Sequence, residues 1–417
     1  MRLLWIATKA PWPPADGGRL LLLESLKALA EHSAASAPGV EVTLLAPISP
    51  IAPIAPDERA AAEAALAGIC TPRLVAVRPR ARAFAALAAT LSGRPYSVVR
   101  HQRAALTRAV ARELAGARRA PFDLVVAEQL QAFAQSTPAV SAGIPRLLRA
   151  QNVESDLWRQ LGEASRGLTR TLLLREARRL ARAERAAVGA ATATLALSAA
   201  DGERLRNLGP EGATVEVLAP PFPERLEGAA QRLSGNPAVV LFGSAGWEPN
   251  RRGERRFVDE IWPRVRAASP GALLHWFGGR PAEGPGDDRP GVCVHRSPTG
   301  SADAFAPGAV LVLPLDIASG VRMRVLEAWA RGVVVVASPE AASGLHASDG
   351  RELLLARSGE EFAVAVERLG AAAGLAEQLI AGGRARLAAD HAPAKFAARL
   401  VALAERLATQ GRGAPRR

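Results

Sequence analysis

Two arginines and a glutamate, spaced over little more than one helical turn, are the side chains of this sequence best suited to chemistry. Arg322, Arg324 and Glu327 lie between two apolar runs, 309–314 and 333–337, that predict buried parallel strands. The segment between these runs therefore forms a loop and a short helix that begins at the carboxyl end of a strand. Backbone amides at a helix start attract anions, and the two guanidinium groups add positive charge. The carboxylate of Glu327 can accept the hydroxyls of a ribose, so the segment predicts a nucleotide site.

Strand-like and helix-like segments alternate along the whole chain, which predicts an α/β protein with parallel sheets. The first half is predicted to contain strands at residues 3–7, 42–46, 73–77, 124–127, 146–150, 192–198 and 214–218. The strands predicted in the second half are at 238–242, 273–277, 292–295, 310–313, 333–337 and 352–355. Helical patterns lie between them, for example at 20–31, 103–115, 168–188, 253–267 and 360–369.

A proline-rich segment, residues 219–237, interrupts this alternation and predicts a linker. We therefore predict an N-terminal domain over residues 1–225 and a C-terminal domain over residues 226–392. The remaining segment, residues 393–417, contains a helix that we expect to pack back on the domains. Its apolar face carries Phe396, Leu400, Leu403 and Leu407.

Composition excludes several classes of protein. Of the 417 residues 49% are hydrophobic, but no apolar run approaches the roughly eighteen residues of a membrane span. The two cysteines, Cys70 and Cys293, fall in different halves, and the six histidines show no metal-ligand spacing, which indicates a cytosolic protein without a disulfide or a metal site. The net charge of +13 favours anionic partners such as nucleotides or lipid headgroups. Nucleic acid is not an expected partner, because basic and aromatic residues do not interleave.

One predicted helix, residues 168–188, is unusually basic. Its basic face carries Arg175, Arg178, Arg179, Arg182 and Arg185. Exposure to solvent explains such a face, and contact with an anionic membrane surface is the alternative. Glu184 projects from the opposite, apolar face, where it either pairs with an arginine across a domain surface or contacts a cleft between domains.

Four segments, taken in their order and spacing, carry a family resemblance. They are Pro-Trp-Pro-Pro-Ala-Asp-Gly-Gly-Arg at 11–19, Gln-Asn-Val-Glu-Ser at 151–155, Phe-Gly-Ser-Ala-Gly-Trp-Glu-Pro-Asn at 242–250 and Gly-Val-Arg-Met-Arg-Val-Leu-Glu-Ala at 320–328. The second is similar to a His-Asn-Val-Glu-Ser segment, and the last to a Gly-Thr-Arg-Leu-Lys-Ile-Leu-Glu-Ala block, of the group 1 (family 4) glycosyltransferases. The chain resembles most closely the sugar transferases of bacterial exopolysaccharide clusters.

This resemblance implies a GT-B fold, in which two Rossmann-like domains with parallel sheets face each other across a cleft. It implies a glycosyltransferase of the hexosyltransferase type, with a nucleotide-sugar donor on the second domain, a glycan or lipid-linked acceptor on the first, and retention of configuration. No metal or other cofactor is implied, because helix amides and basic side chains stabilise the departing diphosphate. The acceptor and the charge suggest a cytoplasmic protein of cell-surface or exopolysaccharide biosynthesis, attached reversibly to anionic lipid on the inner face of the membrane.

The matched block assigns roles in the second domain. Arg322 and Arg324 match catalytic positions near the diphosphate, where fixed positive charge stabilises the leaving group. Glu327 matches the second carboxylate of a Glu-x7-Glu pattern, which takes the ribose hydroxyls. The first carboxylate falls at Ser319, which leaves the backbone amides of Ser319 and Gly320 to contact the transferred sugar.

Two glycine-bearing turns are further donor-binding candidates. Gly243 and Ser244 follow the first predicted strand of the second domain, at a strand-to-helix turn where backbone can approach a phosphate. Many members carry a basic residue at the position of Ser244, and arginines further along are its nearest substitutes. Gly17 and Gly18 precede a predicted helix of the first domain, and their amides either meet the diphosphate from the opposite domain or only make a turn.

The first domain lacks both histidines that family members often carry. Gln129 follows the fourth predicted strand at one of these positions, and Gln151 replaces the histidine of His-Asn-Val-Glu-Ser. Glu128 is the candidate catalytic base on the acceptor side, with Glu154 as the alternative, and either can equally be a structural carboxylate.

These departures motivate other hypotheses. The chain can be a catalytically silent relative that acts as a binding partner in a glycan assembly complex. A sugar-nucleotide epimerase is a third hypothesis, but it needs a set of acid/base carboxylates and histidines that the sequence does not place.

Overall fold

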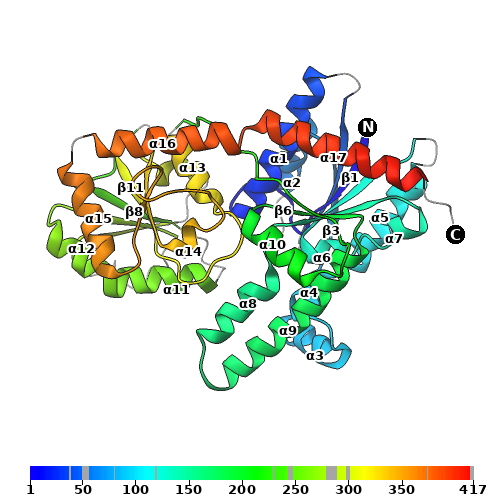
Figure 1. The fold of residues 1–417 in the computed structure, drawn as a ribbon, viewed down its shortest axis with the longest axis horizontal. Coiled ribbons are helices and arrows are strands. Elements are labelled where there is room, and N and C mark those ends of the chain that lie inside the picture. The colour runs from blue at the N-terminus through cyan, green and yellow to red at the C-terminus, as the bar shows by residue number, and fades with distance from the viewer. Residues whose placement is uncertain are drawn as a thin grey trace. The chain divides into compact units, whose positions relative to one another are not determined.

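The computed structural model describes residues 1–36, 39–48, 56–78, 80–117, 120–227, 229, 231–242, 248–278, 289–296, 301–372 and 374–413. The chain divides into two compact units, each built on its own sheet (Figure 1). Unit 1 consists of Met1–Pro13, Gly18–Pro221 and Pro393–Arg417. Unit 2 consists of Pro14–Gly17 and Phe222–Ala392.

The sheet of unit 1 has seven parallel strands in the order β3-β2-β1-β4-β5-β6-β7. They are β1 (Arg2–Ile6), β2 (Glu41–Ile48), β3 (Thr71–Ala76), β4 (Leu124–Glu128), β5 (Arg146–Ala150), β6 (Ala193–Ala196) and β7 (Val215–Val217). The helices are α1 (Gly17–Ala35), α2 (Pro56–Ala67), α3 (Arg82–Ser92), α4 (Tyr96–His101), α5 (Ala104–Gly116), α6 (Gln129–Phe133), α7 (Pro138–Ser141), α8 (Glu154–Glu163), α9 (Gly167–Ala190), α10 (Ala199–Leu208) and α17 (Pro393–Gly413). Apart from the half-buried Arg2, the central strands β1 and β4 are buried, and their residues 3–6 and 124–127 are continuous apolar runs, as in strands covered on both faces.

The sheet of unit 2 has six parallel strands in the order β10-β9-β8-β11-β12-β13. They are β8 (Ala238–Phe242), β9 (Leu273–Phe277), β10 (Val292–His295), β11 (Ala309–Leu313), β12 (Val334–Ala337) and β13 (Leu354–Leu355). The helices are α11 (Glu248–Arg256), α12 (Trp262–Ala268), α13 (Met323–Arg331), α14 (Pro339–Ala342), α15 (Gly359–Ala371) and α16 (Leu375–Asp390). A π-helical turn at Phe257–Ile261 joins α11 to α12, and a 3-10 turn spans Ser301–Ala304.

Both sheets have the doubly wound order of a Rossmann fold. In each, the chain begins at a central strand, builds outward to one edge, and then returns to build the other side. The order reverses between β1 and β4 in unit 1 and between β8 and β11 in unit 2. Ligands of such sheets bind at the carboxyl ends of the strands beside this reversal. The predicted α/β class with two Rossmann-like parallel sheets is confirmed, and so are the predicted strands, to within a few residues.

Helix α17 lies on unit 1, although its sequence follows unit 2. Phe396, Leu400, Leu403 and Leu407 are buried in the same apolar core as residues of β1 and β2. The apolar face read from the sequence is therefore the face that packs. A search of the described helices finds none that is long and apolar enough to cross a membrane.

Candidate functional site

Helix α13 places the residues of the predicted nucleotide site at the carboxyl edge of the second sheet. The helix ends at Gly332, whose positive φ of 71° suits a glycine, and the N–H of Val333 donates to the Ala328 carbonyl at 2.8 Å. Its other side packs on α16, where a Cβ at Gly383 would lie 2.4 Å from the ring of Trp329. Only a glycine allows this approach, so α13 is fixed tightly between strand and helix.

Glu327 is the centre of a buried ion-pair network. The residue is 1% exposed, and its Oε2 accepts a hydrogen bond from Arg324 Nη1 at 2.9 Å. Its Oε1 accepts from Arg331 Nε at 3.3 Å and from the hydroxyl of Ser301. A buried carboxylate is tolerated when it is paired and hydrogen-bonded, and two guanidinium groups meet that condition here.

Arg324 is held on two sides. Its guanidinium carbon lies 3.9 Å from the centre of the Phe242 ring at the end of β8, a cation–π contact. Burial lowers the pKa of Arg324, while the charges of Glu327 and Asp16 oppose that shift. A guanidinium remains charged even so, which leaves a cation at the reversal between β8 and β11.

The predicted glycine turn of the first loop meets the start of α13. Gly17 belongs to unit 2 and opens α1, and a Cβ added to it would lie 3.6 Å from Met323 Cβ. Gly18 is the second residue of α1. Backbone amides at a helix start are suited to an anion, and Gly17 is the one of the two predicted glycines that lies beside α13 within unit 2.

Arg322 has a different place from Arg324. It precedes the first residue of α13, and its guanidinium donates to the carbonyl of Ser319 in its own loop. Gly320, between them, has a φ of 76°, which a side chain would disfavour. Arg322 therefore helps to shape the loop on which Ser319 and Gly320 lie.

The predicted site residues Gly243 and Ser244 lie in the turn after β8, at residues 243–247, which is outside the described residues. The next basic residues are in α11, where Arg252 Nε donates to Asp316 Oδ2 at 2.5 Å. Since Asp316 follows β11, this ion pair ties α11 to the loop that leads to α13.

Four aromatic rings line the carboxyl edge of the second sheet beside Arg324. Phe242 packs edge-on against Phe277 and Phe305, with centroids 6.2 and 6.0 Å apart. His295 stacks on Phe277 at 4.4 Å. The sequence analysis did not identify these residues. Three of them, Phe242, Phe277 and His295, end predicted strands, and an aromatic ring at the end of a strand could have indicated them.

Glu128 lies at the reversal point of the first sheet, but both of its oxygens are engaged. It is 1% exposed, and its Oε2 accepts from Trp5 Nε1 at 2.9 Å. Its Oε1 accepts from Gln151 Nε2 at 2.8 Å and from Arg149 Nη1 at 3.2 Å. Arg149 is fully buried, so the pair is a charged contact inside the sheet. The role of catalytic base stays a prediction, and these partners favour a structural role.

Gln129 and Gln151, the two replacements for histidine, are in contact. Gln129 Nε2 donates to Gln151 Oε1 at 2.7 Å, and Gln151 in turn donates to Glu128. Gln129 has a φ of 66°, a left-handed backbone that non-glycine residues seldom adopt. Strained backbone of this kind is common at functional sites, and here it forms the turn from β4 into α6.

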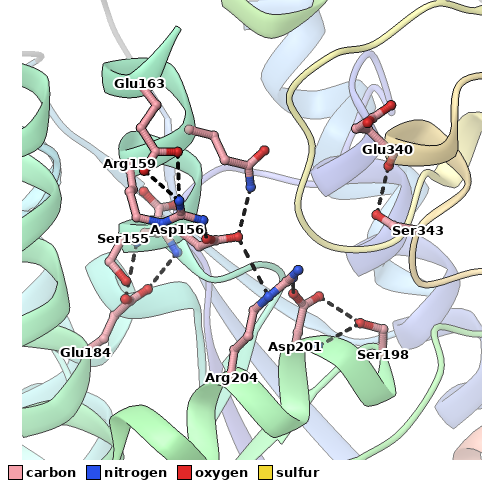
Figure 2. A network of polar contacts seen from close by, with 12 residues as sticks. Ser155, Asp156, Arg159, Glu163, Glu184, Ser198, Asp201, Arg204, Glu340 and Ser343 are labelled. Atoms are coloured by element: carbon pink, nitrogen blue, oxygen red, sulfur yellow. Dashed lines mark hydrogen bonds and ion pairs between the residues drawn. The ribbon is translucent and has the colours of Figure 1, made fainter. Parts of the chain in front are cut away.

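Glu184 caps a helix rather than pairing with an arginine, so the predicted arginine partner is wrong. Its carboxylate accepts the backbone N–H groups of Glu154 at 2.6 Å and Ser155 at 3.2 Å, the first residues of α8 (Figure 2). A negative charge is favourable at a helix start. Burial nevertheless raises the pKa of Glu184 to about 7, and it also raises the pKa of Glu154.

The basic face predicted on α9 is divided. Arg179 lies 3.8 Å from Glu176, and Arg185 donates to the carbonyl of Leu208 at the end of α10. Four arginines of the predicted set are exposed: Arg175, Arg178, Arg182 and Arg185.

The described part of the chain contains no group of three or more His, Cys, Asp and Glu side chains that could hold a metal ion. Cys70 and Cys293 are both free cysteines. Burial raises the pKa of the Cys70 thiol to about 12, which makes it unreactive at neutral pH.

Comparison with known proteins adds a family to this geometry. Residues 251–402 match the family model described as glycosyl transferase-like. No sequence among the curated proteins matches the chain significantly.

Solved structures share the fold over nearly the whole chain. HepE from Anabaena, in complex with UDP and glucose, matches with a TM-score of 0.65 and 13% identity, over 97% of this chain and 100% of that one. Sucrose-phosphate synthase from Thermosynechococcus elongatus matches with a TM-score of 0.67 and 16% identity, over 98% and 100%. TarM from S. aureus, in complex with UDP, Fondaparinux and alpha-GlcNAc-glycerol, matches with a TM-score of 0.62 and 7% identity, over 97% and 99%.

The chain has the GT-B fold that the resemblance implied, and its residues 251–402 are similar to the glycosyl transferase-like family. The match over residues 251–402 agrees with the resemblance to group 1 glycosyltransferases that the four motif segments carry.

Proposed function

We propose that this enzyme transfers a hexose from a nucleoside-diphosphate donor to a glycan or lipid-linked acceptor, with retention of configuration, in cell-surface or exopolysaccharide biosynthesis. The observation that carries the proposal is the network at the start of α13, where Arg324 is fixed between Glu327 and Phe242. The HepE structures with UDP and with UDP-glucose support the choice of donor.

On the donor side, the positive groups meet the charge that develops as the sugar leaves. When the bond from the anomeric carbon to the diphosphate breaks, its electron pair moves to a phosphate oxygen. The guanidinium of Arg324 and the amide of Gly17 stabilise that oxygen, with Arg322 shaping the adjacent loop. Groups held rigidly before reaction are the most effective at this, and Arg324 is held by two contacts. The reaction needs no metal in this arrangement.

Glu327 has a second task, which is to bind the ribose. Three donors use its two oxygens, and a carboxylate offers about four acceptor sites. Of these three donors, only the Ser301 hydroxyl is uncharged. A ribose hydroxyl therefore replaces Ser301 at Glu327 Oε1 more easily than it replaces an arginine. The amides of Ser319 and Gly320 contact the transferred sugar.

On the acceptor side, the pair Gln129–Gln151 holds the attacking hydroxyl. An amide both donates and accepts hydrogen bonds but does not remove a proton at neutral pH. The proton of the hydroxyl therefore passes to the phosphate oxygen that gains the electron pair. Glu128 orients Gln151 in this scheme, because both of its oxygens already accept hydrogen bonds.

Calorimetry with uridine and guanosine diphosphate tests the proposal, together with hydrolysis of the corresponding hexose donors. We expect the native chain to bind one of the two diphosphates and to turn over its hexose donor, and Arg324→Ala to abolish that turnover. Failure to bind either diphosphate contradicts the proposal. Binding without turnover of any donor or acceptor instead supports the silent homologue that acts as a binding partner.

A further inference from the structure

Helix α3 presents its largest apolar side chains to solvent. Phe84, Leu87 and Leu91 are 60%, 57% and 79% exposed, whereas its buried residues are Ala85 and Ala89. At about 100° per residue, the three large side chains lie within about 60° of one another, on the side away from the two alanines. A helix on the surface of a globular protein normally has the opposite arrangement. The three residues, here called the α3 apolar face, therefore suit an apolar partner.

The segment that carries the α3 apolar face is positively charged throughout. Nine arginines and no acidic residue lie between Glu63 and Glu113 in the sequence. Arg78 and Arg82 precede the face and Arg94 follows it, and all three are exposed. The partner of this face is therefore anionic as well as apolar.

The start of α9 has the same combination. Leu168 and Leu172, one turn apart, are 74% and 56% exposed. Three exposed arginines and no acidic residue lie between Glu163 and Glu176: Arg166, Arg170 and Arg175. In Figure 1, α3, α8 and α9 occupy the same, lower end of unit 1. The two apolar and basic segments thus share one region of that unit.

We propose that the α3 apolar face, together with the start of α9, docks unit 1 onto an anionic lipid bilayer. Apolar side chains on one side of a helix, flanked by arginines, are typical of helices that lie in the bilayer interface. Clustered arginines bind the phosphates of anionic lipids, and each adds to the attraction. The docking surface shares Arg175 with the basic face expected from the sequence but lies towards the start of α9, since Arg179 lies beside Glu176 and Arg185 donates to the Leu208 carbonyl.

Docking to a bilayer would supply the lipid-linked acceptor of the proposed function, and in this respect the inference rests on that function. The chain enters α3 from the carboxyl end of β3, and in a parallel sheet all carboxyl ends share one edge. Gln129 and Gln151 follow two other strands at that same edge. A bilayer at α3 therefore brings a lipid-linked acceptor to the edge of the sheet where the acceptor hydroxyl is held.

Co-sedimentation of the full chain with vesicles tests the proposal. We expect binding to phosphatidylcholine vesicles that contain phosphatidylglycerol to be at least about tenfold tighter than to phosphatidylcholine alone, and to weaken with salt. Replacement of the α3 apolar face by F84S/L87S/L91S is expected to lower that binding about tenfold or more. The charge reversal R78E/R82E should act in the same direction. The exposed residues Val364 and Arg368 of α15 provide the matched control V364S/R368E, which should bind as the native chain does.

Absence of binding by the native chain, or undiminished binding by F84S/L87S/L91S, overturns the proposal. Self-association that the same triple variant abolishes, without vesicle binding, makes the face a protein interface and overturns it too. Diphosphate binding in the absence of vesicles separates this inference from the proposed function. The triple variant should retain diphosphate binding. If the native chain itself binds no diphosphate, the proposed function is contradicted, but the vesicle result still stands.

Discussion

Arg324 Nη1 lies 2.9 Å from Glu327 Oε2, so the residue assigned to the diphosphate and the residue assigned to the ribose form one buried ion pair. Substitution of either one changes the environment of the other. Residues that share a network of this kind have effects that do not add. The variants of this site are therefore best compared as conservative pairs.

Arg324→Lys keeps the positive charge but loses the planar fork and its contact with the Phe242 ring. We expect kcat to fall about 100-fold to 1,000-fold, the range typical of losing one preorganised donor to a developing anion. Steady-state kinetics with the preferred donor measures this. The exposed Arg368→Lys is the control, and an unchanged kcat for Arg324→Lys would remove Arg324 from the catalytic machinery.

Glu327→Gln and Ser301→Ala separate the two tasks of the network. We expect Glu327→Gln to weaken the binding of the nucleoside diphosphate about tenfold to 100-fold, because a charge-assisted hydrogen bond to the ribose is lost. Ser301→Ala should bind at least as tightly as the native chain, since it removes a competitor for Oε1. Calorimetry gives both affinities. Tight binding by Glu327→Gln would exclude the ribose role, and weaker binding by Ser301→Ala would show that its hydroxyl assists the nucleotide instead.

Glu128→Leu and the double variant E128L/R149M distinguish a structural pair from a catalytic base. The single change leaves Arg149 buried without its carboxylate, which we expect to lower the free energy of unfolding by about 3–5 kcal/mol. Removing both charges should restore most of that stability. Chemical denaturation measures the stabilities. If the stable double variant retains turnover, Glu128 is structural; if it folds but has no activity, Glu128 acts in transfer, either as the base or by orienting Gln151.

Glu184→Gln should make stability less dependent on pH. The pKa of Glu184 rises from 4.5 to about 7 on burial, so the native state holds a proton that the unfolded state releases. The native chain therefore loses stability as the pH rises from 4.5 to about 7, by about 3 kcal/mol at most. The glutamine variant lacks this loss. Unfolding curves at several pH values for both proteins measure it, and parallel pH profiles would show that Glu184 titrates normally.

Removal of metal ions should leave transfer unchanged. The proposed stabilisation of the diphosphate uses guanidinium and amide groups, which a chelator does not affect. Donor turnover with and without EDTA, followed by addition of Mg²⁺ or Mn²⁺, measures the dependence. A loss of activity that a divalent ion restores would contradict the metal-independent mechanism.

The sequence predicted those parts of the fold that depend on local composition. The strands of both sheets were read from apolar runs, because strands covered on both faces need such runs. The sequence also predicted helix α13 with Arg322, Arg324 and Glu327, because a loop, a helix and a strand follow each other within this short segment. The terminal helix was recognised by the spacing of Phe396 and its apolar neighbours.

The tertiary structure alone decided which side chains meet. Glu327 contacts Ser301, Glu128 contacts Trp5 and Arg149, and Glu184 caps α8. Each partner lies many residues away, and the contact depends on strand order and helix packing, which local periodicity does not encode. For the same reason the sequence identified the basic face of α9 but not the hydrogen bond from Arg185 to the carbonyl of Leu208 at the end of α10. Local patterns thus determined the elements and carried the family resemblance, whereas long-range packing determined the partners of each charge.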